Sequence, residues 1–193
     1  MFNEKASSSD AIGSQLVLGG ATENAARGGG VFHFKCYDKD GNLKWEDKAP
    51  NKVVNVGLKD MNDKYFSGSG YTATWFLGLV NNSPSPTYAA GDTMSSHAGW
   101  VESAAYTQAT RPAVTFGAAT TADPSVIDNS GAVDVFTMNA SVTIAGAFLT
   151  SNSTKSGTTG TLFSVSTFQS PGARTVVSGD TLNVTYEFSL DAA

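Results

Sequence analysis

The sequence contains a series of apolar runs separated by turn-forming residues. Residues 71–80 form an uncharged run of apolar and aromatic side chains, with glycine and serine before it and asparagine, serine and proline after it. Such a run is typical of a strand that is buried on both faces. Four later segments are also strand-like: residues 132–138, 142–150, 161–168 and 181–190.

Residues 181–190 alternate between apolar and polar side chains. One face carries the apolar set Leu182, Val184, Tyr186, Phe188 and Leu190. This period of two predicts a sheet with one solvated face, which is typical of antiparallel strands. Residues 31–37 alternate in the same way, with Phe32, Phe34 and Cys36 on one face. Asp40-Gly41 follows, so we expect a hairpin turn at residues 38–42 and a returning strand at 43–46.

One segment has helical instead of strand-like spacing. Residues 51–66 place apolar side chains three to four positions apart, which predicts one short helix. Asn51 or Asn55 would serve as its N-cap, and Gly57 would weaken it. Gly146, inside the strand-like residues 142–150, indicates a bulge or a close approach of another backbone.

These patterns predict an all-β fold, an antiparallel β-sandwich of jelly-roll type with one short helix and an extended N-terminal arm. We expect the arm to cover residues 1–30 and the β-sandwich domain residues 31–193. Within that domain, residues 31–70 would form the hairpin and helix, and residues 71–193 the main sheets. Residues 91–112 are expected to be irregular with short strands, residues 114–116 to add one more strand, and residues 152–160 to form a flexible loop.

Residues 1–30 have few large apolar side chains, and their one cluster is Leu16, Val17 and Leu18. The segment ends in Arg27 and three glycines, which we interpret as a flexible joint. Two interpretations stay open: a disordered tail, and a partner-binding arm that orders against a neighbouring subunit. Fully extended, 30 residues span about 100 Å, which is far enough to contact another protomer.

Charge and cysteine content exclude several classes of protein. The net charge is -5 and the sequence has no basic run, so we expect neither nucleic acid nor an anionic membrane as a partner. Cys36 is the single cysteine, so no intrachain disulfide forms, which fits folding in a reducing cytosol. We find no signal-peptide core and no apolar run near the roughly 20 residues that span a bilayer.

Candidate catalytic chemistry is sparse. His97 lies near Asp92 and Ser96, but a Ser-His-Asp triad is defined by geometry, and no Gly-x-Ser-x-Gly motif accompanies these residues. The segment 38–42 has the letters of a calcium loop without the late acidic ligand that such a loop needs. Histidines and cysteine are too scattered to indicate zinc. We therefore expect no catalytic residue, no cofactor and no metal, and a protein that is not an enzyme.

Trp100, Tyr106 and Arg111 occur together in the irregular segment. Exposed aromatic and arginine side chains often mark a binding surface, so these three are a candidate interaction surface. The alternative is that Trp100 and Tyr106 belong to the core and that Arg111 pairs with Glu102.

Several blocks are familiar in combination. They are residues 32–46 with 51–55, residues 89–94 with 97–100 and 111–112, and the later segments 146–150 and 178–184. Over roughly residues 31 to 190 the chain resembles a family of small virion structural proteins of tailed bacteriophages. The arm lies outside the resemblance, and the matching motifs fall in turns and strand cores.

The resemblance implies a role in the phage particle instead of a reaction. We expect a capsid decoration, or cement, protein, made in the host cytoplasm and located in the virion. Its partners would be the phage major capsid protein or neighbouring virion subunits, and it would form a homo-oligomer, a trimer or a dimer. The alternative is a tail or fibre component whose β-sandwich binds a host glycan.

Overall fold

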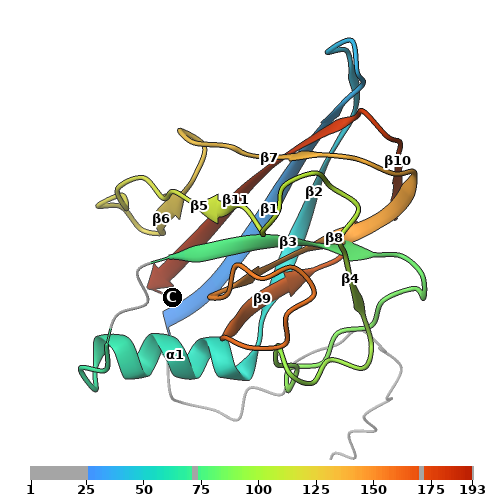
Figure 1. The fold of residues 1–193 in the computed structure, drawn as a ribbon. Helices are drawn as coiled ribbons and strands as arrows, with labels where there is room; N and C mark the ends of the chain where they lie inside the picture. Colours follow the sequence, from blue (N-terminus) through green and yellow to red (C-terminus); the bar gives the residue numbers. More distant parts are fainter. Residues whose placement is uncertain (1–25, 71–73, 170–171, 193) are drawn as a thin grey trace, which may run out of the picture.

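A computed structural model describes residues 26–70, 74–169 and 172–192, and these ranges form an all-β, sandwich-like fold with one short helix (Figure 1). This confirms the predicted fold class. In chain order the elements are β1 (Ala26–Tyr37), β2 (Leu43–Val53), α1 (Asn55–Tyr65), β3 (Trp75–Asn81), β4 (Val101–Ser103), β5 (Ala113–Val114), β6 (Ser125–Asp128), β7 (Asp134–Thr137), β8 (Val142–Thr150), β9 (Leu162–Ser166), β10 (Arg174–Val176) and β11 (Thr181–Ala192).

The strands pair antiparallel in the order β4-β3-β8-β9-β2-β1-β11-β6, while β5 pairs with β3, β7 with β11 and β10 with β8. The long strand β2 belongs to both layers. Its residues up to Pro50 pair with β1, and Asn51–Val53 pairs with β9. On the opposite side, Gly117 N donates to Asp128 O at 2.8 Å, which links the segment after β5 to β6. The two layers are therefore connected along both sides.

The main core lies between the two layers. The expected apolar faces of β1 and β11 point into it, because Phe32, Phe34, Leu182 and Val184 are fully buried. Phe32 also packs on Tyr186, with 4.6 Å between the ring centroids. Each such side chain contributes about 1.5–3 kcal/mol to the free energy of unfolding.

A second apolar cluster covers the other face of β3, β8 and β9. It contains Val80, Phe148 and Val165, and Trp100 covers it from the loop before β4. These three strands are therefore buried on both faces, which explains why their sequences read as continuous apolar runs. This confirms the interpretation of residues 71–80 over the part that the structure describes, from residue 74 onward.

The helix is shorter than predicted, and both expected N-caps are wrong. α1 follows Val54, whose side chain makes no cap hydrogen bond. Asn51 lies in β2, where its Nδ2 donates to the Tyr186 hydroxyl at 2.8 Å. Gly57 is not simply a weak point, because a Cβ atom there would lie 2.4 Å from the carbonyl oxygen of Phe163. The glycine lets α1 approach the backbone of β9.

The strand β1 starts earlier than expected, which moves the boundary of the arm. Gly28 pairs with Leu190 and Gly30 with Phe188, so the three glycines belong to a strand and not to a flexible joint. Arg27 lies opposite Asp191 in the same ladder. Leu16, Val17 and Leu18 lie outside the described residues. The division at residue 70 is also not a structural one, since β1 and β2 occupy the middle of the strand order.

Two local predictions are confirmed. The turn at residues 38–42 forms the hairpin tip, where the Asp38 carboxylate accepts hydrogen bonds from Asp40 N and Asn42 N, both at 2.9 Å. At Gly146, the register between β3 and β8 shifts, and a Cβ atom would lie 1.9 Å from the carbonyl oxygen of Ser166. Gly146 is therefore both a bulge and a close backbone approach.

Candidate functional site

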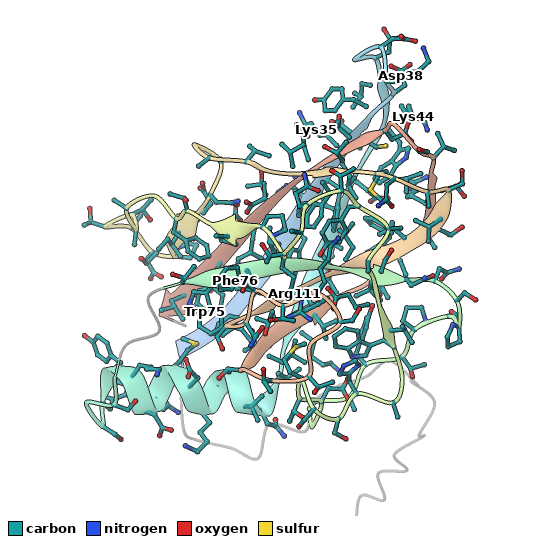
Figure 2. The ribbon with its side chains drawn as sticks, in the orientation of Figure 1. Lys35, Asp38, Lys44, Trp75, Phe76 and Arg111 are labelled. Carbon is teal, nitrogen blue, oxygen red and sulfur yellow. The ribbon has the colours of Figure 1, made fainter. Side chains whose placement is uncertain are left out.

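The three side chains expected to form an interaction surface are buried. Trp100 is 2% exposed, and Tyr106 and Arg111 are each 1% exposed, so the interpretation as an exposed surface is wrong. The alternative is confirmed, since Arg111 forms a bidentate ion pair with Glu102. Its Nε lies 2.9 Å from Oε1 and its Nη2 lies 2.7 Å from Oε2. Figure 2 shows Arg111 in the interior of the protein.

Arg111 also organises the loop between β8 and β9, which the sequence predicted to be flexible. Its Nη1 donates to Asn152 O at 2.8 Å, and its Nη2 donates to Gly157 O at 3.1 Å. Ser156 N donates to the Glu102 carboxylate at 2.8 Å. The ion pair thus makes further hydrogen bonds with loop backbone, which offset the cost of burying its charges. The loop is an ordered part of the fold.

His97, Asp92 and the nearby serines do not form a catalytic arrangement. The Asp92 carboxylate accepts from Trp100 Nε1 and from Ala89 N, both at 3.1 Å. The His97 ring stacks on the Trp100 indole at 4.0 Å, and its Nδ1 lies 3.1 Å from the Trp100 carbonyl oxygen. In the described part of the chain, no hydrogen bond joins His97 to Asp92, Ser95 or Ser96. These contacts hold Trp100 against the second apolar cluster.

A buried thiol and carboxylate lie beside the hairpin. Asp180 accepts hydrogen bonds from Lys44 Nζ and from Val177 N, and its Oδ2 lies 3.8 Å from Cys36 Sγ. Burial, followed by the negative charge of Asp180, raises the pKa of the Cys36 thiol to about 12. The thiol is therefore protonated at neutral pH and poorly suited to act as a nucleophile or a metal ligand.

A second buried carboxyl group joins β7 to β11. Burial raises the pKa of Asp134 to about 7, although the Asn129 amide donates to its Oδ2 at 3.0 Å and opposes the shift. Asn129 itself is fully buried and accepts from Tyr186 N at 2.7 Å. The pKa of this group therefore lies near neutral pH, and its hydrogen-bond partner Asn129 belongs to the fold.

An apolar pocket of about 220 Å³ lies at the end of the sandwich where α1 packs. Its aromatic walls come from four separate segments: Trp75 of β3, Phe116 after β5, Phe163 of β9 and Phe188 of β11. α1 contributes Asp60, Met61 and Lys64. Figure 2 shows Trp75 close to α1. The pocket is not predictable from the sequence, because no local spacing indicates that these segments converge. Apolar pockets of this kind are common ligand sites in β-barrels.

The same end of the molecule presents exposed aromatic side chains. Tyr65 ends α1 and is 83% exposed, and Phe66 follows it and is 78% exposed. Their ring centroids lie 4.9 Å apart. Leu58, on the outer side of α1, is about half exposed. We call Leu58, Tyr65 and Phe66 the helix patch. Large apolar side chains that gather on a surface typically mark a contact with another molecule.

Within residues 26–70, 74–169 and 172–192, no three histidine, cysteine or acidic side chains cluster as metal ligands would. In those same ranges, no helix has the length and apolar character needed to cross a bilayer. Comparisons with protein-family models, with curated proteins and with solved structures found no match.

Proposed function

We propose that this protein is a structural component of a tailed-phage virion, a capsid decoration protein that binds the outer surface of the head and stabilises it. The major capsid protein or neighbouring virion subunits are its partners, and it acts as a homo-oligomer. The resemblance of residues 31 to 190 to small phage virion proteins supports this proposal, and so does the all-β body. A decoration protein stabilises a shell by burying contact area.

The observation that carries the proposal is the position of the helix patch. Gly28, near the start of β1, lies near Phe188, since a Cβ atom added there would come within 3.3 Å of the Phe188 ring. Phe188 lines the same pocket as α1. The strand β1 therefore begins at the end of the body that carries the helix patch (Figure 1). An arm and exposed aromatic side chains at one end suit attachment to a larger assembly.

The alternative of a glycan-binding tail or fibre component gains no support from Trp100 and Tyr106, because both side chains are buried. Likewise, His97 gives no support to a hydrolytic Ser-His-Asp triad, because its ring stacks on Trp100 and its Nδ1 lies 3.1 Å from the Trp100 carbonyl oxygen.

Two measurements test the proposal. The first is the copy number in purified virions, where a decoration protein is expected in hundreds of copies per particle by symmetry of the shell. A count of a few copies per particle would rule out decoration of the head.

The second measurement is binding to purified heads that lack the protein. The variant Tyr65→Ser/Phe66→Ser is expected to lose binding. Leu43→Ser is the matched control, because Leu43 is also an exposed apolar side chain, 51% exposed, but lies in β2 beside the hairpin tip at the other end of the molecule (Figure 1). Equal binding by the two variants would show that the helix patch is not the attachment surface.

A further inference from the structure

The apolar pocket has the size and chemistry to hold aliphatic side chains. It measures about 220 Å³, whereas a cavity of about 150 Å³ already accommodates a benzene-sized molecule. Trp75, Phe163 and Phe188 provide apolar walls, and Trp75 and Phe163 pack edge to face at 5.4 Å. The polar groups of the lining already have partners in the protein: the Tyr186 hydroxyl accepts from Asn51 and Ser164, and Lys64 Nζ lies 3.8 Å from Asp60 Oδ1. The pocket therefore suits an occupant that is mainly apolar.

The chain itself brings such side chains to the pocket. The described residues begin at Ala26, and two residues later Gly28 lies near the Phe188 ring that lines the pocket, since an added Cβ atom would come within 3.3 Å of that ring. In residues 1–25, the cluster of large aliphatic side chains is Leu16, Val17 and Leu18. Eight residue steps separate Leu18 from Ala26, and they span up to about 26 Å when extended. The connection is therefore long enough for the triplet to reach the pocket of its own chain, and Gly19-Gly20 would permit a chain reversal.

We propose that residues 16–18 dock in this pocket of their own chain, with the side chains of Leu16 and Leu18 inserted between the aromatic walls. In an extended segment, residues i and i+2 point to the same side, so Leu16 and Leu18 enter together and Val17 faces away. The short connection favours the chain's own segment over that of another copy, because it raises the effective concentration to roughly millimolar.

This inference does not depend on the proposed function. It concerns a contact between two parts of the same chain in the isolated protein, and it holds whether or not the protein attaches to a capsid. A second copy's residues 16–18 and a foreign apolar ligand are the competing occupants, and the following experiments distinguish them.

Crosslinking of the full-length chain tests the position of the segment. Val17→Cys is combined with Asp60→Cys, since Asp60 lines the pocket, and the protein is treated at low concentration with a short bismaleimide. Cys36 is fully buried and does not compete for the reagent. We expect an intrachain crosslink. The matched control combines Val17→Cys with Asp40→Cys at the far hairpin tip and is expected to remain uncrosslinked. Equal crosslinking of both pairs, or crosslinks between chains alone, would overturn the proposal.

Dye binding tests whether the two leucines occupy the pocket. The amphiphilic dye 1-anilinonaphthalene-8-sulfonate, which fluoresces when its aromatic rings enter an apolar site, is added to full-length wild type, Leu16→Ser/Leu18→Ser and Val17→Ser. We expect a several-fold rise in dye fluorescence, with energy transfer from tryptophan, for the double variant alone. Val17→Ser is the control, because Val17 faces away from the pocket. If the wild type binds the dye as strongly as the double variant, the pocket is open to a foreign ligand and the proposal is wrong.

Discussion

Replacing Arg111 with methionine removes one member of a buried ion pair and leaves the Glu102 carboxylate with a single hydrogen bond, from Ser156 N. The carbonyl groups of Asn152 and Gly157 lose their donors as well. Breaking a buried pair in this way typically lowers the free energy of unfolding by 3–5 kcal/mol, or about 6–20 °C in Tm for a chain of this size. A domain has about 5–15 kcal/mol in total, so the effect is large.

Urea unfolding of wild type, Arg111→Met, Glu102→Gln and the double variant measures the coupling. We expect the double variant to lose about 2–3 kcal/mol less than the sum of the single losses, because it contains no unpaired buried charge. Trypsin should also cleave after Lys155 faster in Arg111→Met, since the loop loses its anchor. Additive losses, or a loss below about 1 kcal/mol for Arg111→Met, would refute the view that this ion pair holds the loop.

Three further predictions concern other buried groups. The pKa of Asp134 rises from 3.8 to about 7 on folding, so between these pH values the carboxyl group ionises in the unfolded state before it does so in the folded state. The free energy of unfolding therefore falls with rising pH over this range, by up to about 4 kcal/mol. In a pH series of urea melts, Asp134→Asn should remove this fall, and an unchanged pH dependence would contradict the raised pKa of Asp134. Gly57→Ala should lower the free energy of unfolding by about 1–3 kcal/mol, because the new Cβ atom meets the backbone of Phe163 and this clash outweighs the better helix propensity of alanine. Gly91→Ala is the control and should leave the free energy of unfolding unchanged, because nothing lies within 4 Å of a Cβ atom there. Cys36 should react with a disulfide reagent at pH 8 only at the rate of unfolding, and fast labelling of the native protein would show that the thiol is accessible.

Strands with a buried partner on each side could be predicted from the sequence. The expected strand at residues 142–150 coincides with β8, because that strand is central and buried on both faces and its apolar run ends where burial ends. The short strands β6 and β10 were missed. β6 has four residues and pairs with β11, and β10 has three residues and pairs with β8. Because these strands are short, their conformation depends more on this pairing than on their own side chains.

The site residues show a different limit. The sequence pattern around Trp100, Tyr106 and Arg111 is compatible with exposure at an interface and with burial in a core. Whether these side chains are exposed or buried depends on where their contact partners lie in the fold. One partner, Glu102, was near enough in the sequence to be considered as an alternative. The pocket could not be anticipated, since residues as distant as Trp75 and Phe188 meet there through the long-range pairing of the sheet.

The sharing of β2 between the two layers has a mechanical consequence. Its first part is bonded to β1 and its last three residues to β9, so the layers cannot slide past or peel away from each other without rupturing the same strand. A load applied at the hairpin tip would be transmitted along β2 into the opposite layer. Pulled between its ends in a single-molecule force experiment, the body should rupture in one event instead of two.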